Sequence, residues 1–127
     1  QGVLERAARY SKERVTFGHP ICENQAIAFK LAEMATEIEV ARAMLYNTAR
    51  MSDNGVPFSK EATMCKMFCS EMCVRVCDMG LQIMGGYGLC NEYEVERFYR
   101  DAKLLTIGEG TSEICRMVVG RHVLKEY

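Results

Sequence analysis

The sequence predicts an all-α domain, an up-down four-helix bundle with one additional short helix. Apolar residues repeat with helical period over long stretches, and no stretch combines strand-like alternation with hairpin turn signals. The two prolines and most glycines fall between these periodic stretches. Two helices of about 27 residues joined by a short loop must pack antiparallel, which gives an up-down arrangement.

The first two helices are predicted from their periodicity. A helix over residues 2–15 ends in a loop over residues 16–24, which contains a glycine and a proline. A long second helix is expected over residues 25–52, and Gly55 is the expected left-handed residue after its end. Its apolar face consists of residues spaced by three and four, namely Ile27, Leu31, Met34, Ile38, Ala41 and Leu45.

The second half of the chain is predicted to form three more helices. One covers residues 59–84, with Ser59 as its cap and the glycines of residues 85–88 at its end. Its inward face carries Met64, Phe68, Met72, Val76, Met79 and Ile83. A shorter helix is expected over residues 92–103, and a last helix from about residue 111 to residue 125.

Composition and charge limit the function classes. With 127 residues, 49% of them hydrophobic and 26% charged, the chain is long enough for one globular domain and too apolar for a disordered segment. A net charge of -1 gives no reason to expect a nucleic acid or a membrane surface as partner, and no apolar run approaches the roughly 18 residues of a membrane span. Because the sequence begins at Gln1 within a helical pattern, we expect residues 1–127 to be one domain of a longer protein.

Four of the seven cysteines recur every four residues, as Cys65, Cys69, Cys73 and Cys77. On a helix this spacing makes one stripe, which could be a metal or redox site or a row of small apolar side chains at a tight helix contact. Packing is favoured because no histidine lies nearby and successive thiols along one helix make a poor tetrahedral cage. No metal site is expected, and the odd cysteine count favours a reducing setting.

One carboxylate has an unusual setting. Glu109 lies between Gly108 and Gly110, and a helical pattern follows directly. Flanking glycines permit unusual backbone angles and leave space beside the acid, while a helix N-terminus presents free N–H groups to an anion or oxyanion. Such a carboxylate could be a general base, or it could complement the helix dipole. The residues by themselves leave both interpretations open.

Two other motifs could bind a ligand. Gly85 and Gly86 could let a ligand approach the backbone closely, although local chemistry favours a helix C-cap and turn as their explanation. Arg14 and Thr16 stand together at a helix end, where they could bind a phosphate. A solvated arginine is the alternative for Arg14.

In combination, five motifs resemble the C-terminal helical domain of the acyl-CoA dehydrogenases. They occur in order over nearly the whole chain: RVTFG, LAEMATEIEVAR after Gln25, QIMGGYG, VERFYRDAK and GEGTSEICR. The resemblance implies that this part is the C-terminal four-helix bundle of an enzyme that also has an N-terminal helical domain and a middle β-domain.

The resemblance further implies FAD shared across a dimer interface, in a homo-oligomer that is a dimer of dimers. Thr111 and Glu113 match residues near the FAD of their own subunit. A larger set matches the segment that reaches the FAD of a neighbouring subunit: Arg14, Thr16, Phe17, Gln25, Gln82, Gly85 and Gly86.

For the reaction, the resemblance implies α,β-dehydrogenation of an acyl-CoA thioester with Glu109 as catalytic base. Glu109 takes the α-proton while the β-hydrogen leaves as hydride to the flavin, and Gly110 is a substrate-binding residue by position. Gly108 stands where many members carry a tyrosine beside the acyl chain, which leaves room for a bulkier or branched acyl group. The implied electron acceptor is an electron-transfer flavoprotein, and the implied location is the cytoplasm, or the mitochondrial matrix in a eukaryote.

Two alternatives remain open at this point. The same fold could run the chemistry backwards as an enoyl-CoA reductase, or pass electrons to oxygen as an oxidase. A structural helical bundle without activity is the alternative from another class. Glu109, Gln82 and Thr111 are all present, which argues against a decayed site.

Overall fold

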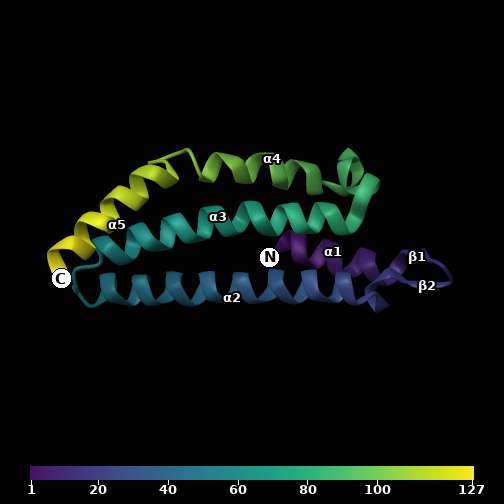
Figure 1. The fold of residues 1–127 in the computed structure, drawn as a ribbon, viewed down its shortest axis with the longest axis horizontal. Coiled ribbons are helices and arrows are strands. Elements are labelled where there is room, and N and C mark those ends of the chain that lie inside the picture. The colour runs from purple at the N-terminus through teal and green to yellow at the C-terminus, as the bar shows by residue number, and fades with distance from the viewer.

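The structure, a computed structural model, describes all 127 residues and contains five α-helices. They are α1 (Gly2–Glu13), α2 (Gln25–Asp53), α3 (Ser59–Met84), α4 (Val95–Leu105) and α5 (Ser112–Glu126). Figure 1 shows α2 and α3 running antiparallel, α1 beside one end of this pair, and α4 and α5 following one another along the other side of α3. The predicted all-α bundle is confirmed, with a fourth rod that is broken into two helices.

The core lies around α3, which contacts each of the other four helices. Met34 of α2 and Val95 of α4 are fully buried in it. Gly80 lets α1 approach α3 closely, because a Cβ atom at this position would collide with Val3. The other apolar side chains of this cluster are Ala7, Ile21, Ile38, Val76, Cys77, Ile83, Met84 and Ala102.

A short hairpin, which the sequence pattern did not indicate, connects α1 and α2. Strand β1 (Val15–Thr16) pairs antiparallel with β2 (His19–Pro20). The turn residues Phe17 and Gly18 have φ values of 51° and 90°, which matches the twist that a two-residue hairpin turn needs. Sequence reasoning missed it because each strand has only two residues and the turn lacks the usual Asn-Gly or Asp-Gly pair.

Two predicted helix starts were also wrong in detail. Residues Asn91–Tyr93 form a 3₁₀ turn, and α4 begins only at Val95 because Glu94 adopts left-handed backbone with φ 61°. At the start of α3, Ser59 already lies inside the helix and no side chain caps the first turn. Gly55 does adopt the expected left-handed conformation, with φ 67°.

The cysteine stripe lies along α3, and all seven cysteines are free thiols. The sulfur atoms of Cys65 and Cys69 are 3.7 Å apart, and Cys69 Sγ lies 4.0 Å from the carbonyl oxygen of Ala41 on α2. No group of three or more histidine, cysteine, aspartate or glutamate side chains is arranged to hold a metal ion. These two thiols thus lie at the contact between α2 and α3.

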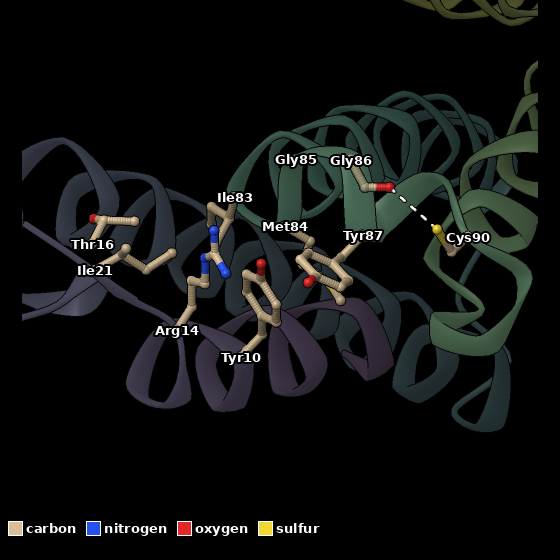
Figure 2. Close-up of a pocket in the computed structure, with 10 residues that line it drawn as sticks. All are labelled: Tyr10, Arg14, Thr16, Ile21, Ile83, Met84, Gly85, Gly86, Tyr87 and Cys90. Carbon is tan, nitrogen blue, oxygen red and sulfur yellow. Dashed lines mark hydrogen bonds between the residues drawn. The ribbon is translucent and has the colours of Figure 1, made fainter.

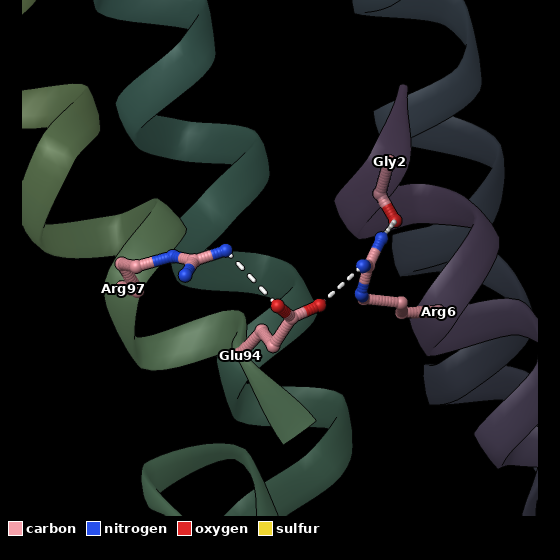
Figure 3. Close-up of polar contacts among 4 residues, drawn as sticks. All are labelled: Gly2, Arg6, Glu94 and Arg97. Atoms are coloured by element: carbon pink, nitrogen blue, oxygen red, sulfur yellow. Dashed lines mark hydrogen bonds and ion pairs between the residues drawn. The ribbon is translucent and has the colours of Figure 1, made fainter. Parts of the chain in front are cut away.

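Glu94, at the start of α4, bonds two arginines, and one of them links it to α1 (Figure 3). Glu94 accepts a hydrogen bond of 2.6 Å from Arg6 of α1 and one of 3.0 Å from Arg97, and Arg6 also donates to the carbonyl of Gly2. The hydrogen bond from Arg6, followed by the charge of Arg97, lowers the pKa of the Glu94 carboxyl.

No helix of the chain is both long and apolar enough to cross a membrane.

Candidate functional site

The break between α4 and α5 places Glu109. The carbonyl of Leu104 accepts hydrogen bonds from the N–H groups of Ile107 and Gly108, so the chain tightens at the end of α4. Glu109 then turns into left-handed backbone with φ 55°, and Gly110 follows with φ 105°. A non-glycine residue in this conformation is unfavourable, and at functional sites it persists where the surroundings over-determine it. The flanking glycines that marked this acid in the sequence form this turn.

The other side of the break is closed by two hydrogen bonds. The N–H of Ser112 donates to the carbonyl of Thr106 over 3.1 Å. The hydroxyl of Thr111 accepts from the N–H of Ile114 over 3.3 Å, so Thr111 is the N-cap of α5. The turn between the two helices is therefore tied at its start and at its end.

The carboxylate of Glu109 has no partner within the chain, as it makes neither an ion pair nor a side-chain hydrogen bond. Its own backbone N–H and that of Gly110 donate no hydrogen bond either. Glu109 borders a cavity of about 590 Å³ between α3 and the break, together with Lys66, Cys69, Ser70, Leu104, Leu105 and Gly108. A free carboxylate and free backbone donors thus occur together, which is what abstraction of a proton beside a carbonyl requires.

The thiol of Cys69 does not compete with this carboxylate. Burial, followed by the hydrogen bond with Cys65, raises the pKa of Cys69 to about 11, so the thiol stays protonated near neutral pH. Among the residues that line the cavity, Glu109 is the one carboxylate. A carboxylate in this position is a candidate general base.

A second cavity, of about 520 Å³, lies where the ends of α1 and α3 meet and gathers four of the predicted cofactor residues: Arg14, Thr16, Gly85 and Gly86. The Arg14 guanidinium makes no ion pair and lies 5.6 Å from the centre of the Tyr87 ring. Figure 2 shows it beside Tyr10, with the two glycines above the Tyr87 ring in this view. Side-chain atoms at Gly85 or Gly86 would meet nothing within 4 Å, so the glycine backbone is open to a ligand. An unpaired guanidinium beside open backbone fits a phosphate-bearing cofactor such as FAD.

A third cavity, of about 360 Å³, lies at the start of α5 and includes Thr111 and Glu113. The hydroxyl of Ser112 also lines it and is buried without any hydrogen-bond partner, which fits a polar ligand atom in this cavity. Hydrogen bonds from its own backbone N–H and from the Thr111 hydroxyl lower the pKa of Glu113. Glu113 is therefore ionised at neutral pH.

Three predicted cofactor residues lie outside these cavities. Phe17 is fully exposed at the hairpin turn, Gln25 is exposed at the first position of α2, and Gln82 is exposed on α3. The group around Arg14 and the group around Glu109 are separated by α4, whose 11 residues span about 16 Å. Within one chain, the predicted site residues therefore form two separate groups.

A comparison with protein families identifies the family of this chain. A family model described as the acyl-CoA dehydrogenase C-terminal domain matches residues 1–124. The chain belongs to this family.

Relatives of this acyl-CoA dehydrogenase domain are similar over almost all of its length. The probable acyl-CoA dehydrogenase YngJ of Bacillus subtilis is 53% identical over 98% of this chain and 33% of the relative. The CarC subunit of the caffeyl-CoA reductase-Etf complex of Acetobacterium woodii is 48% identical over 99% of this chain and 33% of the relative. The structure of butyryl-CoA dehydrogenase from Megasphaera elsdenii superposes with a TM-score of 0.94 at 45% identity, over 96% of this chain and 32% of that one. The chain therefore spans about a third of the length of these relatives.

In this acyl-CoA dehydrogenase domain, the sequence did not predict that Lys66 lies beside Glu109. This lysine lines the cavity of Glu109 from α3, and its ammonium group donates to the carbonyls of Leu105 and Gly110. The sequence carries no local signal for this contact, since a single lysine on a helix usually faces solvent. The contact depends on how α3 packs beside the break.

Proposed function

We propose that this chain is the C-terminal domain of an FAD-dependent enzyme that oxidises an acyl-CoA thioester between its α and β carbons. The observation that carries the proposal is the state of Glu109, a carboxylate without a partner, beside free backbone N–H groups and a cavity. Membership in the acyl-CoA dehydrogenase family supports the same chemistry.

In the proposed reaction, Glu109 takes the α-proton of the acyl group. Charge then develops on the thioester carbonyl oxygen, where the N–H of Glu109, which has no acceptor in the chain, is available as a donor. Gly110 keeps the substrate side of the turn free of a side chain. The bound flavin would accept the β-hydrogen as hydride.

The separation of the site residues supports FAD shared between subunits. Arg14, Gly85 and Gly86 line a different cavity from Glu109, and the 11 residues of α4 span about 16 Å between the two, so we propose that the three residues bind the FAD of a neighbouring subunit. Thr111 and Glu113 would then contact the FAD of their own subunit. A homo-oligomer built as a dimer of dimers would bring the two groups together. The exposed Phe17 at the hairpin turn is available for such a contact.

The direction of the reaction and the electron partner are finer parts of the proposal. We infer dehydrogenation as the main direction, because relatives such as butyryl-CoA dehydrogenase carry that name. The reductase relative from Acetobacterium woodii belongs to a complex with an Etf, which favours an electron-transfer flavoprotein as acceptor and keeps the reverse direction as the second candidate. The proposed location is the cytoplasm, or the mitochondrial matrix in a eukaryote.

Glu109→Gln in the flavoenzyme that contains this domain tests the proposal. The amide keeps the size of the side chain but cannot act as the base, so flavin reduction by acyl-CoA should fall by at least about 100-fold. FAD should remain bound, since Arg14 and Thr111 are unchanged. Flavin absorbance in rapid mixing measures both quantities, and reduction near the normal rate would place the base elsewhere.

A further inference from the structure

Lys66 connects the two ends of the turn that carries Glu109. Its Nζ donates to the carbonyl of Leu105, the last residue of α4, over 3.0 Å. The same ammonium donates to the carbonyl of Gly110, directly after Glu109. Figure 1 shows α3 running alongside α4 and α5, so a side chain from α3 can reach the break.

These two bonds go to a carbonyl at a helix end and to a residue with left-handed backbone. The carbonyl of Leu105 is one of the acceptors that a helix leaves unpaired at its C-terminus. Gly110 and Glu109 both have positive φ, and the left-handed region is unfavourable for a glutamate. Charge-assisted hydrogen bonds are about twice as strong as neutral ones, so one ammonium can fix both carbonyls.

The lysine does this without neutralising the acid. Lys66 and Glu109 border the same cavity, yet they form no ion pair within 4.0 Å. Other hydrogen bonds of the turn join backbone groups that are close in sequence, such as the bond from the N–H of Ser112 to the carbonyl of Thr106. Lys66 is thus the contact with α3 that fixes the residue next to Glu109, while the carboxylate stays free.

We propose that Lys66 is a positioning residue, which holds the Glu109 turn in its left-handed conformation and so aims the carboxylate at the substrate. The proposal rests on the function proposed for Glu109. Lys66 acts through the backbone of Leu105 and Gly110 and needs no contact with the substrate.

The test compares three variants of the complete flavoenzyme. Lys66→Met keeps the length of the side chain without its donors, and Lys66→Arg keeps both charge and donors. Lys60→Met is the matched control, because Lys60 lies on the same helix and bonds Glu126 of α5 over 2.5 Å, away from the break. Two quantities are measured: hydrogen exchange of residues 105–112, and flavin reduction with ordinary and α-deuterated acyl-CoA.

In Lys66→Met, exchange over residues 105–112 should accelerate, and flavin reduction should slow by between about tenfold and 100-fold, as small misplacements of catalytic groups do. The α-deuterium isotope effect should grow, since proton abstraction becomes slower relative to other steps, and KM should change little. Lys66→Arg should restore both rate and isotope effect, and Lys60→Met should alter neither.

Faster exchange in Lys66→Met with an unchanged rate and isotope effect would overturn the proposal, because Lys66 would then be structural only. Unchanged exchange would overturn it as well. Glu109→Gln, measured in parallel, separates the two proposals. If that variant is inactive while Lys66→Met reduces flavin normally, only the role of Lys66 fails. If Glu109→Gln reduces flavin normally, the proposed base fails and the role of Lys66 fails with it.

Discussion

Glu94 and Glu109 have nearly the same backbone but opposite surroundings. Both are glutamates in left-handed conformation, with φ values of 61° and 55°, and each stands just before a helix, α4 and α5 respectively. Glu94 lies between the guanidinium groups of Arg6 and Arg97 (Figure 3), whereas Glu109 has no partner at all. The strained conformation by itself therefore does not mark a catalytic residue.

The neighbours decide what each acid can do. Two arginines lower the pKa of Glu94, which makes it a poor proton acceptor and a good link between α1 and α4. Around Glu109, Gly108 and Gly110 leave space, and Lys66, which lines the same cavity, bonds backbone carbonyls. Glu94 therefore links two helices, while the carboxylate of Glu109 is left without a partner.

Replacing each glutamate by aspartate should give the largest difference in flavin reduction between Glu109 and Glu94. Glu109→Asp keeps the charge, and aspartate tolerates left-handed backbone better than most residues, but the carboxylate retreats by one methylene. We expect flavin reduction to fall about 100-fold, in line with the effect of misplacing a catalytic group by about 1 Å. Glu94→Asp is the matched control and should leave this rate unchanged. A Glu109→Asp variant with the normal rate would mean that reach does not limit the base.

Straining the turn tests the backbone without touching the carboxylate. Gly110 has φ 105°, which an L-residue rarely adopts, so Gly110→Ala must shift the turn although the added Cβ has open space. We expect flavin reduction to fall by between about tenfold and 100-fold. The free energy of unfolding should fall by about 1 kcal/mol or more.

Gly120→Ala on α5 is the control for Gly110→Ala, because Gly120 lies inside the helix with open space for a Cβ. It should keep the rate and gain up to about 1 kcal/mol of stability. Rapid mixing and denaturant unfolding measure the two effects. Equal behaviour of the two alanine variants would show that the conformation of Gly110 is not required.

The space beside Glu109 should set substrate preference. Gly108 does not have positive φ, and a Cβ there would lie 3.4 Å from the carbonyl oxygen of Leu104, a tolerable contact. Gly108→Tyr should place a ring in the cavity and reduce kcat/KM for branched acyl-CoA relative to straight acyl-CoA by about tenfold. Steady-state assays with a matched pair of substrates measure this ratio, and an unchanged ratio would place the acyl chain elsewhere.

The sequence predicted most of the fold because long amphipathic helices leave a periodic pattern. The expected ranges 25–52 and 59–84 agree closely with α2 and α3. It did not predict the late start of α4, because a glutamate gives no sign that it will turn left-handed at position 94. The glycines on either side of Glu109 did point to an unusual backbone there, because the conformational freedom of glycine can be inferred from the sequence alone.

Contacts between distant residues could not be predicted in the same way. Lys66 and Gly110 are 44 positions apart, and their hydrogen bond exists only because α3 packs beside the break. The separation of Arg14 from Glu109 likewise follows from the length and direction of α4, not from either motif. The functions of Phe17, Gln25 and Gln82 stay predictions, because all three are exposed in the single chain.

The smallest expected effect concerns Glu94, where only stability should change. Its lowered pKa means that its stabilising contribution is complete above the ordinary value of 4.5 and is lost as the pH falls through the lower value in the folded state. Glu94→Gln should therefore lower the Tm slightly near pH 7, and the difference from the unmodified enzyme should close in acid below about pH 4.5. Salt should also shrink this difference, since Arg6 and Glu94 are partly exposed and screening weakens such pairs. Flavin reduction should stay at its normal rate. A loss of rate in Glu94→Gln as large as that in Glu109→Gln would contradict the division of roles between the two acids, because it would mean that the link to α1 also sets the position of the base.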